Sequence, residues 1–166
     1  MDDLGALCRS IGLVSLDCDG VMTDGRLYYG DDGAQMRAFH VRDGVGIKML
    51  MAAGIAVAFI SGSRTAAIER RARDLGVAHC LTGIEDKLAA IRALCAGLGI
   101  GLDAVCHVGD DVNDLPVMAR VGLAATVFDA DPAVRAAARI VTARRGGDGA
   151  VRELAERLLD ARGERV

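Results

Sequence analysis

The sequence predicts an α/β fold: a parallel sheet with helices on both faces, plus a β-hairpin inserted after the first strand. Short, almost continuously apolar runs alternate with amphipathic segments along the chain, which is typical of buried parallel strands joined by helices. Several of these runs stop abruptly at carboxylates or at a serine beside glycine. Ligands bind beyond the carboxyl ends of parallel strands, so these stops are where we expect the functional site.

The first half of the chain is expected to build the centre of the sheet and the hairpin. Strands are predicted from short apolar runs, and helices from apolar residues three and four apart that end at glycine. The hairpin is predicted from the turn residues at 30–33 between two short aromatic-rich arms. The expected elements are a helix at 1–10, a strand at 11–16, hairpin arms at 26–29 and 35–40, a helix at 43–53, a strand at 55–60 and a helix at 64–75.

The second half repeats the alternation and ends in a glycine-rich tract and a helix. The tract at 144–149 opens a C-terminal tail of about 144–166. The expected elements are a strand at 77–81, a helix at 85–98, a strand at 104–108, a helix at 115–121, a strand at 123–128, a helix at 131–138, a strand at 140–142 and a helix at 150–162.

Composition limits the classes of partner. A length of 166 residues fits a single domain over 1–166. The net charge is −3, with acids and bases interspersed, so the chain has no basic surface of the kind that nucleic acids or anionic membranes attract. The acidic start, the lack of a long apolar run and five scattered cysteines without a C-x-x-C pair indicate a reduced, cytoplasmic protein.

Four polar points at the expected strand ends suggest a phosphate site. They are Asp17 with Asp19, Ser61 with Gly62, Lys87, and the cluster Asp110, Asp111 and Asp114. Carboxylates gathered at one edge need a cation, and hard oxygen ligands suit Mg²⁺. With Lys87 also offsetting charge, Asp17 could attack phosphorus as a nucleophile while Asp19 moves the proton as general acid and then base. We expect Gly20, Ser61, Gly62 and Lys87 to hold the phosphate.

Each residue also has a simpler interpretation. A single D-x-D after a strand is often turn chemistry, and Asp111 and Asp114 could equally cap the next helix or support the site from behind. Ser61 could cap a helix starting near Ser63, and an isolated lysine such as Lys87 is usually solvated. Arg42 is a weak candidate for binding a sugar carboxylate. His40, His79 and His107 lack metal-ligand spacing and are interpreted as structural.

The motifs DCDGVMTDG, ISGSR, the Lys87 region and GDDVND resemble, in this order, the four motifs of the haloacid dehalogenase (HAD) phosphohydrolases. Within that superfamily, AFHVRDGVGIKML and the tail GGDGAVRE resemble the cap-less phosphatases of 3-deoxy-D-manno-octulosonate (KDO) 8-phosphate and of nonulosonate 9-phosphates. The resemblance runs from about residue 13 to residue 153.

This resemblance implies a Rossmann-like HAD core that hydrolyses a keto-acid sugar phosphate. It implies Mg²⁺ bound by Asp17, Asp110 and the backbone carbonyl of Asp19, and phosphate bound by Ser61 and Lys87. It further implies a homotetramer in which the hairpin, about 26–40, packs between subunits and a neighbour helps to close each site. The C-terminal tract is implied to reach toward an active site.

Other functions compete with this one. A HAD phosphatase of broader range would share every motif. A receiver domain of a signalling system also uses a phosphorylated aspartate, a hydroxyl residue, a lysine and Mg²⁺, but it lacks the second acid of D-x-D. A non-catalytic assembly subunit is disfavoured because all four motifs are present.

Overall fold

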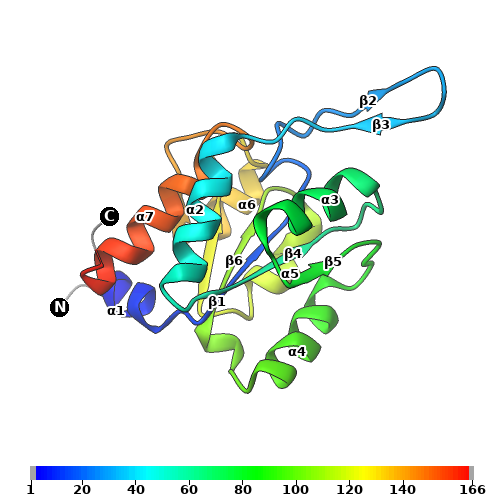
Figure 1. Ribbon diagram of the computed structural model, residues 1–166. Coiled ribbons are helices and arrows are strands. Elements are labelled where there is room, and N and C mark those ends of the chain that lie inside the picture. Colours follow the sequence, from blue (N-terminus) through cyan, green and yellow to red (C-terminus); the bar gives the residue numbers. More distant parts are fainter. Residues whose placement is uncertain (1–2, 165–166) are drawn as a thin grey trace.

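A six-stranded parallel sheet forms the centre of the protein. The computed structural model describes residues 3–164, and its strands run in the order β5-β4-β1-β6-β7-β8 (Figure 1). The predicted fold class is therefore confirmed. The strands are β1 (Leu13–Leu16), β4 (Ala56–Ile60), β5 (His79–Leu81), β6 (Val105–Gly109), β7 (Leu123–Thr126) and β8 (Ile140–Val141). Because β1 lies between β4 and β6, its carboxyl end is at the middle of the sheet edge.

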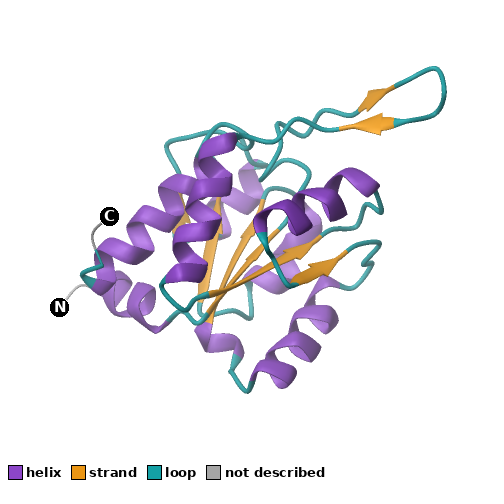
Figure 2. Ribbon diagram, in the orientation of Figure 1, coloured by secondary structure: helices purple, strands orange, loops and turns teal. Residues whose placement is uncertain are grey.

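Helices cover both faces of the sheet (Figure 2). Among residues 3–164, none of the helices has the length and apolar character that crossing a bilayer requires. The helices are α1 (Asp3–Ser10), α2 (Val41–Ala52), α3 (Ala66–Leu75), α4 (Lys87–Leu98), α5 (Leu115–Met118), α6 (Pro132–Ala137) and α7 (Ala150–Arg162), with short 3₁₀ turns η1 (Leu102–Ala104) and η2 (Val112–Asp114).

The central strands are apolar throughout because both of their faces are buried. Successive residues of a strand point to opposite faces, and β1 divides its side chains accordingly. Leu13 belongs to an apolar cluster with Ile91 of α4, whereas Val14 and Leu16 belong to a cluster that includes Leu154 of α7. This explains why the predicted strands show continuous rather than alternating hydrophobicity.

Helix starts differ from the predicted positions by one or two residues because capping side chains decide them. Thr65 Oγ1 accepts the N–H of Ile68, so α3 begins at 66. Asp86 accepts the N–H of Ala89, so α4 begins at Lys87. The last helix, α7, coincides with the predicted range of 150–162.

The hairpin projects away from the body of the protein (Figure 1). Its antiparallel strands β2 (Tyr28–Tyr29) and β3 (Gln35–Met36) are shorter than the predicted arms. Tyr29 is 65% exposed and Met36 is 59% exposed. The hairpin therefore presents large apolar side chains to solvent, which is unusual for an isolated two-stranded ribbon.

The C-terminal tract packs against the loop that follows the first acid pair. The N–H of Gly147 donates to the carbonyl of Val21 at 3.0 Å, and the backbone of Gly146 lies directly against Gly20. Asp43, at the start of α2, accepts the N–H groups of Gly149 and Arg152 at 3.2 and 3.0 Å. The tail is thus held beside the carboxyl end of β1.

Candidate active site

The polar strand ends form a cleft of about 390 Å³ at one edge of the sheet. Parallel strands bring their carboxyl ends to the same edge, so residues far apart in sequence meet here. The lining residues are Asp17, Asp19, Gly25, Ser61, Gly62, Ser63, Asp110, Asp111, Val112 and Asn113.

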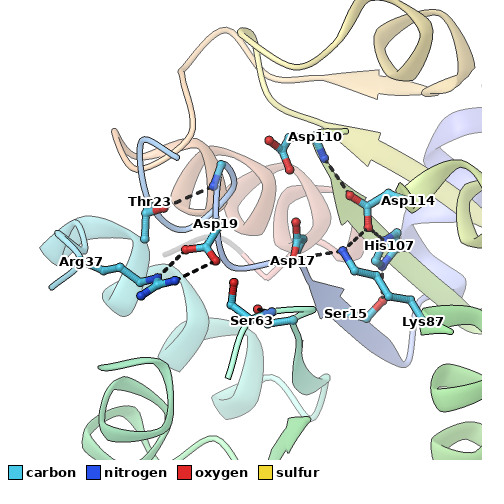
Figure 3. Close-up of polar contacts among 12 residues, drawn as sticks. Ser15, Asp17, Asp19, Thr23, Arg37, Ser63, Lys87, His107, Asp110 and Asp114 are labelled. Atoms are coloured by element: carbon cyan, nitrogen blue, oxygen red, sulfur yellow. Dashed lines mark hydrogen bonds and ion pairs between the residues drawn. The ribbon is translucent and has the colours of Figure 1, made fainter. Parts of the chain in front are cut away.

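Asp17 lies at the centre of the polar groups, between Asp19 and Lys87 (Figure 3). Its N–H donates to the carbonyl of Val108 at 2.9 Å, which continues the pairing of β1 with β6 and fixes the backbone. Its Oδ1 lies 3.1 Å from Lys87 Nζ. Burial raises the pKa of Asp17, and the charge of Lys87 offsets part of this rise. The carboxylate is therefore rigidly placed and poorly solvated, as a nucleophile should be.

Lys87 is a buried bridge between two carboxylates and not a solvated lysine. Its Nζ lies 2.7 Å from Asp114 Oδ1 as well as 3.1 Å from Asp17, and the residue is only 4% exposed. Burial alone would lower the pKa of Lys87, but the charges of Asp17 and Asp114 raise it above its usual value. Lys87 therefore remains a cation, buried between Asp17 and Asp114.

Asp114 supports the site from behind, which is one of the two alternatives that the sequence left open for it. It is fully buried, and it accepts hydrogen bonds from Lys87, from His107 Nε2 at 3.0 Å and from the N–H of Asp110 at 3.1 Å. Burial opposes its ionisation, yet the hydrogen bonds from His107 and Lys87 lower the pKa of Asp114. It does not cap a helix with its side chain.

His107 was interpreted from the sequence as structural, and its partners place it directly beneath the site. It lies on β6 opposite Ser15 of β1, and its Nδ1 is 2.9 Å from Ser15 Oγ. Its other nitrogen binds Asp114. The contact between Ser15 and His107 has a signal in the sequence, because each is a polar residue inside an otherwise apolar strand.

Asp110 faces Asp17 across the cleft and completes a site suited to a cation. Carboxylate oxygens of Asp17, Asp110 and Asp114 all lie within 4.8 Å of one another. Burial and the negative charge of Asp17 raise the pKa of Asp110 to about 8. Gly20 permits this arrangement, because a Cβ at that position would collide with the Asp110 carboxylate. The N–H of Gly20 itself donates to Thr23 Oγ1 at 3.2 Å.

The structure separates the two capping alternatives. Thr65 caps α3, so Ser61 is free of that role; its buried hydroxyl accepts the N–H of Ser63 at 3.1 Å and borders the cleft. Asp111, in contrast, is exposed and accepts the N–H of Val112 as the cap of η2. Ser61 therefore fits a role in ligand binding better than Asp111 does.

Of two arginines, Arg42 and Arg37, the predicted one does not line the cleft and the other was not predicted. Arg42 is exposed and lines a separate cavity with Arg144 and Glu153, away from the acid pair. Arg37, which sequence reasoning missed, reaches from the hairpin to Asp19, with Nε 2.6 Å from Oδ1 (Figure 3). No pattern around residue 37 points to this contact.

Comparison with known proteins shows which family this chain belongs to. The sequence model of the haloacid dehalogenase-like hydrolases matches residues 81–154. The 3-deoxy-D-manno-octulosonate 8-phosphate phosphatase of Yersinia pestis is 44% identical over 158 residues, which are 95% of this chain and 84% of that protein. This chain belongs to that phosphatase family. Membership of an enzyme family removes the receiver-like alternative.

Solved structures of this phosphatase family have the same fold. A crystal structure of the Yersinia pestis phosphatase superposes with a TM-score of 0.96 at 44% identity, covering 98% of this chain and 88% of that one. The Moraxella catarrhalis phosphatase, solved with a magnesium ion, a phosphate ion and KDO, has a TM-score of 0.94 at 37% identity, covering 97% and 92%.

Proposed function

We propose that this protein is a Mg²⁺-dependent phosphatase that hydrolyses 3-deoxy-D-manno-octulosonate 8-phosphate. The observation that carries the proposal is the placement of Asp17, which borders a polar cleft and is held by Lys87 at 3.1 Å. The relatives named above support the choice of substrate, because one is named for this activity and another holds magnesium, phosphate and KDO.

In the first step, Asp17 attacks the phosphorus atom and the ester bond to the sugar oxygen breaks. Asp19, which borders the same cleft two residues on, gives its proton to that oxygen and the sugar leaves as an alcohol. In the second step, Asp19 takes a proton from water, and the water attacks the phosphorus of the aspartyl-phosphate. Phosphate leaves, and Asp17 is regenerated as a carboxylate.

The phosphoryl group needs partners for its oxygens throughout both steps. Ser61 and Gly62 border the cleft and are assigned to hold two of them, with Lys87 supplying positive charge. Gly20 was also predicted to bind the phosphate, and we keep this assignment, although its N–H already donates to Thr23 Oγ1. Its lack of a side chain is what admits Asp110.

Asp17 and Asp110 are the side chains that would hold Mg²⁺, together with the backbone carbonyl of Asp19. They fit a hard cation because burial raises the pKa of both carboxyl groups and the charge of Asp17 raises the pKa of Asp110 further. A divalent ion would stabilise the ionised form of both. Asp114 is less available, since Lys87, His107 and the N–H of Asp110 occupy it. When bound, Mg²⁺ supplies charge neutralisation for the approaching phosphate.

We also propose that the protein is a homotetramer assembled through the hairpin. The exposed side chains of Leu27, Tyr28, Tyr29 and Met36 form the apolar surface that a neighbouring subunit would cover. A chain with residues 27–39 replaced by a short turn should sediment as a monomer, and an unchanged tetramer would refute this role. A cytoplasmic location stays a prediction.

Phosphate release in the presence of Mg²⁺ tests the function. The assay compares KDO 8-phosphate with N-acetylneuraminate 9-phosphate and with simple sugar phosphates. We expect the highest kcat/KM on KDO 8-phosphate. A higher kcat/KM on N-acetylneuraminate 9-phosphate would instead identify a nonulosonate 9-phosphate as the substrate. Equal values on all esters would indicate a phosphatase of broad range. Asp17→Asn should abolish turnover, whereas Asp74→Asn, at the exposed end of α3, should not.

A further inference from the structure

Arg37 makes a two-point contact with the carboxylate of Asp19. Its Nε lies 2.6 Å from Oδ1 and its Nη2 lies 3.3 Å from Oδ2 (Figure 3). A guanidinium that binds both oxygens of a carboxylate fixes the plane of that carboxylate as well as its position. A single hydrogen bond would leave the carboxylate free to rotate.

The contact is too well buried to be an incidental surface pair. The side chain of Arg37 is 1% exposed and that of Asp19 is 23% exposed. A guanidinium removed from water needs a charged partner to offset its loss of hydration. Asp19 provides that partner, and Nη1 adds a longer contact to Gln35 Oε1 at 3.4 Å.

The two residues lie on different sides of the cleft wall. Asp19 borders the cleft together with Asp17 and Ser61, whereas Arg37 is absent from its lining. The guanidinium therefore supports Asp19 from behind. Arg37 follows β3 on the returning arm of the hairpin, so this arm is joined to the residue that we assign to proton transfer.

We propose that Arg37 is a positioning residue that orients Asp19 for proton transfer and thereby links the hairpin to the chemistry. The inference rests on the proposed function, in which Asp19 is general acid and then general base. Arg37 touches neither the phosphate nor the sugar in this role. A displacement of the returning arm is therefore expected to slow the same proton transfers.

Two substrates separate the steps that need Asp19. An alkyl phosphate such as KDO 8-phosphate needs a proton on its leaving oxygen, whereas p-nitrophenyl phosphate releases a stable phenolate without one. The second step, attack by water on aspartyl-phosphate, needs Asp19 with either substrate. A residue that only stabilises the fold would slow both substrates in both steps.

The test uses Arg37→Met in rapid-mixing and steady-state assays with Mg²⁺. For KDO 8-phosphate we expect kcat to fall about 10- to 100-fold, with little change in KM. This is less than the roughly 10²- to 10⁴-fold that general acid–base catalysis contributes, because Asp19 itself is retained. For p-nitrophenyl phosphate we expect the initial burst of nitrophenolate to keep its rate while later turnover slows. Arg26→Met is the matched control, because Arg26 is on the outgoing arm and its side chain is 77% exposed; it should behave as wild type.

Arg37→Lys keeps the buried positive charge and guards against a failure of the methionine variant to fold. It should show the same split between the two substrates with a smaller loss, because an ammonium cannot bind both carboxylate oxygens in one plane. Thermal unfolding of each variant is measured in parallel.

A rise in KM alone, an equal loss of rate in the burst and in turnover, or wild-type kinetics in both Arg37 variants would overturn the inference. The two hypotheses fail differently. A wild-type protein that releases no phosphate from any ester refutes the proposed function and this inference with it. An active wild-type protein whose Arg37 variants have unchanged kinetics refutes only the positioning role.

Discussion

His107 Nε2 lies 3.0 Å from Asp114 Oδ1, and both side chains are completely shielded from solvent. Because a carboxylate only accepts, the hydrogen on this contact belongs to His107. Asp114, held in place by His107, also binds Lys87 Nζ at 2.7 Å, and Lys87 in turn binds Asp17 at 3.1 Å. The candidate nucleophile is thus positioned through a chain of buried contacts that begins inside the sheet.

Replacing His107 with phenylalanine should therefore weaken both the fold and the site. It leaves Asp114 short of one donor and removes the partner of Ser15 Oγ. Losing a buried hydrogen-bond partner is expected to reduce the free energy of unfolding by about 1–3 kcal/mol. Urea unfolding checks this, and His79→Phe, on the edge strand β5, should cost less. Equal losses in the two variants would contradict a special role for His107.

Lys87→Met should be more severe. It leaves Asp17 and Asp114 facing each other without the cation between them, and breaking a buried charge pair typically costs about 3–5 kcal/mol. We expect loss of phosphate release together with a large fall in urea resistance. Arg92→Met, on the exposed face of the same helix, is the control and should retain both properties. A stable and active Lys87→Met protein would show that Lys87 has no role in the active site.

The metal-free protein should lose stability as the pH rises. Burial and the charge of Asp17 raise the folded-state pKa of Asp110 to about 8, whereas an unfolded aspartate titrates at about 3.9. The stabilising contribution of the bound proton is complete below the unfolded-state pKa and is lost as the pH rises through about 8. Thermal unfolding in EDTA should give a lower Tm at about pH 9 than at about pH 6.

Magnesium should cancel this dependence, because a ligand that binds only the folded state stabilises it. Excess Mg²⁺ should raise Tm most at alkaline pH. Asp110→Asn should show a flatter pH profile in EDTA and little response to Mg²⁺. A wild-type Tm that is independent of both pH and Mg²⁺ would argue against Asp110 as a ligand.

Gly146→Ala should uncouple the tail from the active site. A Cβ at 146 would collide with the backbone carbonyl of Gly20, which cannot move aside as a flexible side chain could. We expect the loop after Asp19 to shift and the Mg²⁺ concentration needed for activity to rise. Gly97→Ala is the matched control, since it lies within α4 with open space around it, and it should be neutral or stabilising by up to about 1 kcal/mol.

The strands that carry the candidate site could be predicted because both faces of each are buried, which leaves a short apolar run ending in a polar residue. Asp17, Ser61 and Asp110 were found in this way, and the structure places them at one cleft. The hairpin lies where it was predicted, but its strands are shorter than the predicted arms. Its paired strands cover two residues each, and the next residue on the returning arm, Arg37, contacts Asp19.

By itself, the sequence determined the order of strands and helices, the acids at the strand ends and the family. All three follow from local patterns of apolar, acidic and glycine residues. Only the tertiary structure decided which side chains support those acids. Ser15 meets His107 because β1 and β6 pair in one particular register. Lys87 and Arg37 meet carboxylates 70 and 18 residues away from them in the chain. Such contacts depend on strand order and helix placement, which no local pattern records.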